Sequence, residues 1–145
     1  MEIQRIWALY FSPTGSTRRV VMTLAGELSK CLKVPLQEIP FTQPADRVNE
    51  YSFTDVDLLV IGAPTYAGKL PNKILPDFQV RLHGNGTPAI PVVTFGNRGY
   101  ENSLAELCAV MGENRFQTVA AGAFVCQHAF TDALGYGRPG WSDQF

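Results

Sequence analysis

Residues 3–19 read IQRIWALYFSPTGSTRR, an apolar run that gives way to a loop of hydroxyl side chains around one glycine. The run over residues 3–11 is largely apolar, which is typical of a strand buried on both faces of a parallel sheet. From residue 17 to about residue 32, apolar residues recur at helical spacing. The stretch therefore predicts a strand, a polar loop and a helix, the repeating unit of an α/β fold.

The remainder of the chain repeats this alternation of strands and helices. Further strands are expected at 36–39, 58–62, 89–95 and 116–125, and further helices at 71–82 and around 104–111. Pro76 should delay or kink the second helix, and Ser103 with Glu106 fits a capping box at the third. A chain of 145 residues is expected to form one α/β domain over residues 1–145. Because crossovers between parallel strands are right-handed, few windings of its sheet are possible. Its core would be a doubly wound sheet of five parallel strands in the order 2-1-3-4-5.

The composition excludes several classes of protein. Hydrophobic residues make up 46% of the chain and charged residues 17%, which argues against disorder. A net charge of -1 gives no electrostatic indication of a nucleic-acid or membrane partner. No apolar run approaches the roughly 20 residues that span a bilayer, and the first residues lack the layout of a signal peptide, so a cytoplasmic protein is expected. The three cysteines form no CxxC pair, so no metal site is expected.

The loop after the first strand has the make-up of a phosphate site. A helix N-terminus offers unpaired backbone N–H groups and a partial positive charge, hydroxyls add donors, and glycine allows close approach. The candidate residues are Ser12, Thr14, Gly15, Ser16 and Thr17. Arg18 and Arg19 either add attraction or face water. An ordinary helix cap needs one or two hydroxyls, so four of them favour a phosphate.

Other phosphate-binding loops do not fit. The sequence contains neither the GxxxxGK[ST] of nucleoside-triphosphate loops nor a GxGxxG after the first strand. No cysteine is followed at the sixth position by arginine, which excludes a phosphatase loop of that kind. The first and third strands also end without the acidic residues of a receiver domain.

Two further loops follow the third and fourth expected strands and carry aromatic residues. Residues 63–71 contain Tyr66, and residues 96–100 contain Tyr100, each beside glycines. Either tyrosine alone would more often be a packing residue. Ligands of doubly wound sheets bind beyond the carboxyl ends of the strands, at the switch point of the strand order. Two aromatics there, beside a phosphate loop, predict a slot for a flat ring system.

The three loops together resemble the flavodoxin family, which binds FMN. The motifs are S-x-T-G-S-T, P-T-Y-A-G and F-G-N-R-G-Y, and the likeness runs from about residue 3 to residue 139. The sequence is also similar to the flavodoxin-like domains that some anaerobic bacteria carry fused to ferredoxin modules. The resemblance implies a flavodoxin-like fold with FMN at the switch point.

The resemblance assigns a role to each loop. The phosphate of FMN would be held by Ser12, Thr14, Gly15, Ser16 and Thr17. One side of the isoalloxazine would be wrapped by Pro64, Thr65, Tyr66, Ala67 and Gly68. The other side would be closed, with backbone N–H groups toward the pyrimidine end, by Gly96, Asn97, Arg98, Gly99 and Tyr100. In this family a peptide of the second loop can flip to accept a hydrogen bond from the flavin, so Gly68→Ala is expected to shift the one-electron potential.

Two functions are compatible with an FMN site. The resemblance implies an FMN-binding redox protein that transfers electrons. The alternative is an FMN-dependent NAD(P)H or quinone oxidoreductase in which the flavin takes a hydride, and a flavin-free domain that serves only in assembly is a third class. The near-neutral charge departs from the strongly acidic classical flavodoxins. The expected partner is a redox protein or a small-molecule electron donor or acceptor.

The end of the chain also departs from the family pattern. Family members end with a helix packed on the sheet, but Gly137, Arg138 and Pro139 stand where that helix would begin. The C-terminal helix is therefore expected to be missing. Either the chain is truncated, or another subunit covers the face, which would make a homodimer.

Overall fold

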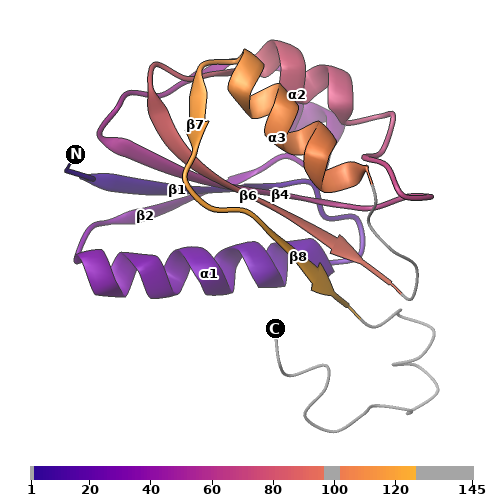
Figure 1. Cartoon of the computed structure of the whole chain (residues 1–145), viewed down its shortest axis with the longest axis horizontal. Helices are drawn as coiled ribbons and strands as arrows, with labels where there is room; N and C mark the ends of the chain where they lie inside the picture. Colours follow the sequence, from indigo (N-terminus) through magenta and orange to yellow (C-terminus); the bar gives the residue numbers. More distant parts are fainter. Residues whose placement is uncertain (1, 97–101, 127–145) are drawn as a thin grey trace, which may run out of the picture.

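A computed structural model describes residues 2–96 and 102–126 and consists of a parallel sheet between helices (Figure 1). The strands of this sheet are β1 (Arg5–Tyr10), β2 (Leu36–Pro40), β4 (Asp57–Pro64), β6 (Thr87–Phe95), β7 (Phe116–Thr118) and β8 (Gly122–Val125). They lie in the order β2-β1-β4-β6-β7, β8 also pairs with β6, and every pairing is parallel. Taken along the chain, this is the predicted 2-1-3-4-5 order, which is confirmed.

The fifth expected strand, residues 116–125, is two strands in the structure. β7 pairs with residues 87–89 of β6, and β8 pairs with residues 92–95. Val119 N donates to Ala89 O, so Ala89 faces this neighbour, and Pro91 two residues further along faces it too. Because proline has no N–H to donate, the ladder is interrupted at that point.

Helices cover both faces of the sheet. α1 (Ser16–Leu32) lies on one face, and α2 (Leu75–Arg81) and α3 (Ser103–Glu113) lie on the other (Figure 1). Pro76 stands in the first turn of α2, and the helix begins at Leu75 rather than at residue 71, the delay that this proline predicts. In the part of the chain that the structure describes, no helix combines the length and apolar character needed to cross a bilayer.

Two shorter pieces complete the described elements. η1 (Pro44–Arg47) is a single 3₁₀ turn between β2 and the next strand. β3 (Tyr51–Ser52) and β5 (Leu82–His83) form a separate two-stranded parallel sheet. These segments pack on the α2 side, where Phe41 stacks on Phe78 with ring centroids 5.8 Å apart.

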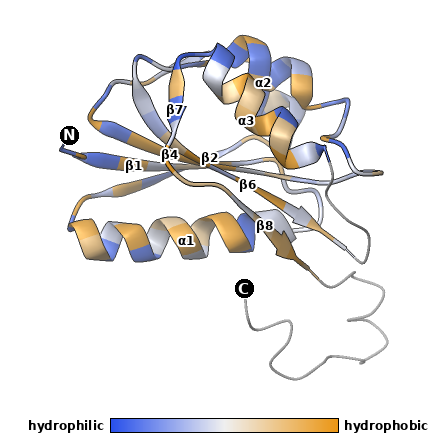
Figure 2. Ribbon diagram, viewed as in Figure 1, coloured by the Kyte–Doolittle hydropathy of each residue, from blue (hydrophilic) through white to orange (hydrophobic). Residues whose placement is uncertain are grey.

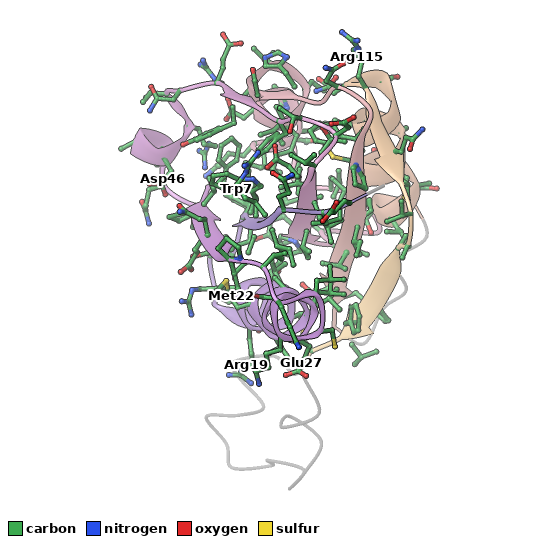
Figure 3. All side chains as sticks on the ribbon, turned by 90° about the vertical axis from the view of Figure 1, so that its left-hand side faces the viewer. Trp7, Arg19, Met22, Glu27, Asp46 and Arg115 are labelled. Carbon is green, nitrogen blue, oxygen red and sulfur yellow. The ribbon has the colours of Figure 1, made fainter. Side chains whose placement is uncertain are left out.

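α1 packs tightly on the middle of the sheet. Its apolar side faces the strands (Figure 2), and Val21 is fully buried there. Arg19 and Glu27 project from its outer side, whereas Trp7 projects from the opposite face of the sheet (Figure 3). Gly62 of β4 lies beneath the helix, and a Cβ at that position would collide with Val21 Cγ2. The glycine therefore lets α1 approach β4 closely, which holds the helix N-terminus beside the carboxyl end of the sheet.

Candidate functional site

The carboxyl ends of β1, β4 and β6 lie at one edge of the sheet, because all the pairings are parallel. Three connections leave this edge, toward α1, toward α2 and toward α3. The first two are described in full, and the third is described only at Gly96 and Asn102. The predicted ring-closing residues Asn97, Arg98, Gly99 and Tyr100 lie outside the described residues, so their role remains a prediction.

The first connection makes a sharp entry into α1. Gly15 has φ +91° immediately before the helix begins at Ser16, a conformation that favours glycine. A Cβ built on Gly15 would meet no atom of the described residues within 4 Å, so these residues leave the space above it open. Thr14 and Gly15 are exposed and Ser16 is half-buried. The loop thus presents a glycine and two hydroxyls to an open space at a helix N-terminus.

The backbone amides at the start of α1 are only partly occupied. Ser12 Oγ accepts from Arg18 N at 2.9 Å, so this side chain caps one amide of the first turn. The amides of Ser16 and Thr17 have no intrahelical acceptor, and they meet no other acceptor within residues 2–96 and 102–126. Two donors therefore remain for an anion, in the positive end of the helix dipole.

The hydroxyl of Thr17 is used inside the protein, so that only the backbone amide of this residue is available to an anion. The residue is 2% exposed, and its Oγ1 lies 2.8 Å from Thr94 Oγ1 of β6. This contact ties the first turn of α1 to the sheet. The predicted set of four hydroxyls therefore divides, because those of Ser12 and Thr17 hold the loop in place, whereas Thr14 is exposed and Ser16 is half-buried.

Arg18 is engaged at the side of the loop. Its Nε donates to Glu38 Oε2 at 2.7 Å and to Tyr10 OH at 3.1 Å, and Tyr10 OH also bonds Glu38. The hydrogen bond from Arg18 is the main cause that lowers the pKa of Glu38, and burial is the main cause that raises the pKa of Tyr10. The Arg18 charge is thus balanced by Glu38 of β2, and its main partner is not the loop.

A second support reaches the loop from the segment after β2. Ser12 N donates to Thr42 Oγ1 at 2.8 Å. Arg47 donates to the carbonyls of Phe41 and Thr42 at 2.9 and 2.7 Å, and its Nε lies 2.8 Å from Asp77 Oδ2. The Arg47 side chain is 7% exposed, so these contacts form a buried brace. Nothing in the local sequence indicates this brace, because its members come from the loop after β1, the segment after β2, η1 and α2.

The second connection begins with a tight hairpin. Tyr66 N donates to Lys69 O at 2.8 Å and Lys69 N to Tyr66 O at 3.1 Å. Ala67 and Gly68 between them have φ +53° and +80°, as in a type I′ turn. Tyr66 is 50% exposed, although large aromatic side chains are usually mostly buried. The turn therefore holds an aromatic ring at the open edge.

The first turn of α3 grips this hairpin through three contacts, and we call Asn102, Ser103 and Glu106 the α3 clamp. Asn102 N donates to Gly68 O at 2.9 Å. Ser103 Oγ lies 2.8 Å from Thr65 Oγ1, and Leu70 N donates to Glu106 Oε1 at 2.8 Å.

The predicted capping box at Ser103 and Glu106 is wrong. The N-cap residue of α3 is Asn102, and its side chain makes no capping hydrogen bond. The two side chains bond the neighbouring loop instead, because the hairpin brings an amide and a hydroxyl within their reach. The S-x-x-E spacing thus pointed to two side chains that do form hydrogen bonds, but their partners are Thr65 and Leu70 rather than the amides of α3. The Gly68 carbonyl is occupied by Asn102, and the predicted peptide flip remains a prediction.

The described residues offer an anion site and an aromatic surface rather than a metal site. Among them, no group of three or more His, Cys, Asp or Glu side chains could hold a metal ion. Two amides that have no acceptor among the described residues, a left-handed glycine and a half-exposed tyrosine suit a ligand with a phosphate at one end and a flat ring at the other.

No protein-family model and no curated protein matches this chain. Solved structures do match. A flavodoxin of Streptococcus pneumoniae TIGR4 superposes with a TM-score of 0.61 and 16% identity, over 83% of this chain and 83% of its own. A putative flavoprotein from Bacteroides uniformis has a TM-score of 0.55 and 18% identity, over 94% and 97%. Another from Bacteroides eggerthii has a TM-score of 0.50 and 19% identity, over 83% and 87%.

These likenesses, with the strand order, establish that the chain has a flavodoxin-like α/β fold.

Proposed function

We propose that this protein binds FMN at the carboxyl edge of its sheet and transfers electrons in the manner of a flavodoxin. The observation that carries the proposal is the open N-terminus of α1, where the amides of Ser16 and Thr17 have no acceptor within the described ranges. The half-exposed Tyr66 at the end of the neighbouring β4 adds a surface for a ring. The names of the structural neighbours, a flavodoxin and two putative flavoproteins, support a flavin as the ligand.

The chain's own residues would divide the binding task between two loops. Thr14, Gly15 and the amides at the start of α1 would hold the phosphate, as anions are held at helix N-termini. The hairpin that carries Tyr66 would lie against the ring, fixed by the α3 clamp. The flavin, when bound, would supply the redox chemistry, and the protein supplies binding, orientation and electrostatics.

A hydride-transferring reductase is the competing function. A net charge of -1 lacks the acidic surface by which a free electron carrier is steered to basic partners, and this favours a small-molecule donor such as NAD(P)H or a quinone acceptor. The partner is then either a redox protein or a small molecule, and association into a homodimer belongs to the same proposal.

Titration of the purified protein with FMN, followed by flavin fluorescence, tests the ligand. Riboflavin is the matched control because it has the same ring without the phosphate. We expect FMN to bind at least about tenfold more tightly than riboflavin, a difference of about 1.4 kcal/mol. Equal affinities would contradict the phosphate site, and failure of both to bind would contradict the flavin function.

Stepwise anaerobic reduction of the FMN-loaded protein, followed by absorbance, separates the two redox functions. Entry of the two electrons in two resolved steps supports a one-electron carrier. Entry of both electrons in one step, driven by NAD(P)H alone, would support the reductase instead.

A further inference from the structure

The contact between Glu106 and Leu70 joins α3 to the segment that carries the proposed ring surface. Glu106 stands in the first turn of α3, where the helix dipole favours a carboxylate, and its Oε1 accepts from Leu70 N at 2.8 Å. A side-chain oxygen of this residue thus reaches the backbone of the segment that directly follows the hairpin. This bond therefore anchors the end of the hairpin segment.

Burial makes the Leu70 amide dependent on that carboxylate. Leu70 is 3% exposed, and it packs into the core cluster beneath α2 and α3. A buried N–H that loses its acceptor is costly, so the segment has to move to satisfy it. Tyr66 lies only four residues before this anchor and is held in the same hairpin. Movement at Leu70 would therefore reach the aromatic surface.

The helix that bears Glu106 is connected to both sides of the proposed ring slot. Its first turn contacts the loop after β4, and in the sequence it follows directly on the loop after β6. The first turn of α3 thus fixes the loop after β4, and the same helix directly follows the loop after β6 in the sequence.

We propose that Glu106 is a positioning residue of the flavin site, which fixes the 65–70 segment through the Leu70 amide and thereby sets FMN affinity and the one-electron potential. The inference rests on the proposed function. Glu106 acts through the loop, since its Oε1 is taken by Leu70 N. What matters is therefore the reach of its acceptor oxygen and not its charge.

Two conservative substitutions separate reach from charge. Glu106→Gln keeps an acceptor oxygen at the same distance from the backbone and removes the charge. Glu106→Asp keeps the charge and shortens the side chain by one methylene group. Glu106→Ala removes both, and Glu113→Ala is the matched control, because Glu113 is an exposed acid at the far end of the same helix.

Amide hydrogen exchange of the flavin-free protein tests the anchor itself. We expect the Leu70 amide to exchange about tenfold faster in Glu106→Ala and Glu106→Asp, and at close to the wild-type rate in Glu106→Gln and Glu113→Ala. Unchanged protection of Leu70 in both Glu106→Ala and Glu106→Asp would overturn the proposal. If Glu106→Ala does not fold, the comparison between the Asp and Gln variants still decides.

FMN titration and anaerobic reduction of the same variants test the consequence. Glu106→Ala and Glu106→Asp should bind FMN about tenfold more weakly, a difference of about 1.4 kcal/mol, with a shifted one-electron potential, whereas Glu106→Gln should bind like the wild type. The reverse order, with Asp like the wild type and Gln weakened, would show that charge matters and overturn positioning. Wild-type affinity and potential in every variant would also overturn it. If the wild type binds no FMN, the proposed function fails, and the exchange data still report whether Glu106 holds the loop.

Discussion

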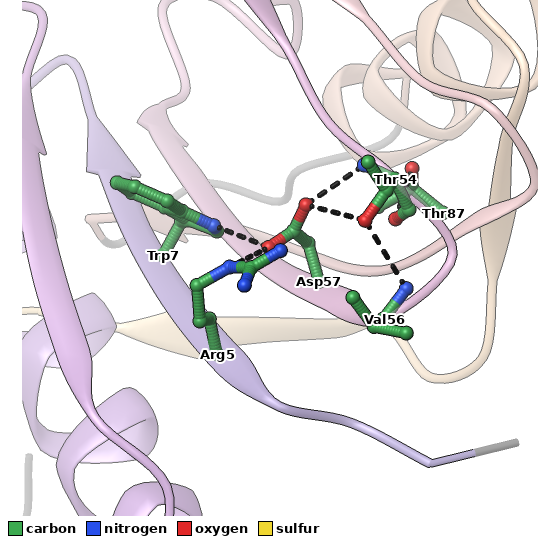
Figure 4. Close-up of polar contacts among 6 residues, drawn as sticks. All are labelled: Arg5, Trp7, Thr54, Val56, Asp57 and Thr87. Carbon is green, nitrogen blue, oxygen red and sulfur yellow. Dashed lines mark hydrogen bonds and ion pairs between the residues drawn. The ribbon is translucent and has the colours of Figure 1, made fainter.

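The two edges of the sheet differ in whether their polar groups are satisfied by other groups of the protein. At the amino edge, Asp57 begins β4, is 3% exposed, and accepts hydrogen bonds from β1 and from the loop that precedes β4 (Figure 4). Arg5 Nε and Trp7 Nε1 donate to Oδ1 at 2.8 and 2.9 Å. The amide and hydroxyl of Thr54 donate to Oδ2 at 2.7 and 3.0 Å. Both carboxylate oxygens are thus used inside the protein.

At the carboxyl edge the donors are held in place but left open. The amides of Ser16 and Thr17 find no acceptor in the described ranges, and a left-handed glycine precedes them. Tyr66 stays half exposed on a turn whose two central residues both have positive φ. A satisfied buried group stabilises the fold, whereas an oriented and unsatisfied group can bind a ligand. One edge therefore contributes stability and the other is available for function.

Removing Asp57 should give the largest loss of stability. Asp57→Ala leaves Trp7 Nε1 and the Thr54 amide without their acceptor, which should cost about 3 kcal/mol of unfolding free energy in urea denaturation. FMN affinity of the folded variant should stay within about twofold of the wild type, because the change lies at the opposite edge. Asp55→Ala, an exposed neighbour, should change stability by less than about 0.5 kcal/mol. A stable Asp57→Ala protein with weakened FMN binding would contradict the assignment of stability to the amino edge and of ligand binding to the carboxyl edge.

Gly15→Ala should affect FMN affinity more than it affects stability, the opposite of Asp57→Ala. The new Cβ would enter the open space proposed for the phosphate, at a positive φ that alanine adopts at a cost of about 1 kcal/mol. FMN affinity should fall about tenfold, or about 1.4 kcal/mol, while riboflavin affinity stays unchanged. Gly26→Ala, in the middle of α1 with open space around it, is the control and should not weaken FMN. Equal loss for FMN and riboflavin would mean that the loop does not hold the phosphate.

The contribution of the ionised Asp57 carboxylate to the free energy of unfolding should depend on pH. Burial by itself would raise the pKa of Asp57, but the hydrogen bonds from Thr54, Trp7 and Arg5 outweigh it and lower the pKa below its ordinary value. A carboxyl with a lowered pKa stabilises the fold above the unfolded-state pKa, and this contribution is lost as pH falls through the folded-state pKa. The stability difference between wild type and Asp57→Asn should therefore shrink below about pH 4. A difference that grew as the pH fell would contradict this assignment.

Ala67→Gly should give the smallest effect, with the opposite sign. Ala67 has φ +53°, which glycine adopts without strain, and the greater freedom of glycine in the unfolded chain offsets part of the gain. We expect a net stabilisation of about 0.5 kcal/mol in urea denaturation. Ala109→Gly, at an exposed position within α3, should instead destabilise by about 1 kcal/mol. Destabilisation by Ala67→Gly would show that the turn is not strained at this residue.

Much of the fold could be predicted from local pattern. Apolar runs, helical spacing and the handedness of crossovers were sufficient for the strand order, and Pro76 marked the late start of α2. The break between β7 and β8 was missed, because it depends on which neighbour Pro91 faces. In the candidate site, the sequence predicted that the first two loops follow the carboxyl ends of β1 and β4, which is where the structure has them. The partners of the side chains did not.

The sequence by itself determined where the strands, helices and loops lie, because period, glycine and proline act over a few residues. It thereby placed the hydroxyl loop and Tyr66 at one edge of the sheet. Only the tertiary structure decided what those groups touch. Thr17 meets Thr94 and Leu70 meets Glu106, across 77 and 36 residues of sequence. A hydrogen bond requires two atoms within about 3 Å in the right direction, and only the packing of helices on the sheet brings such distant residues together.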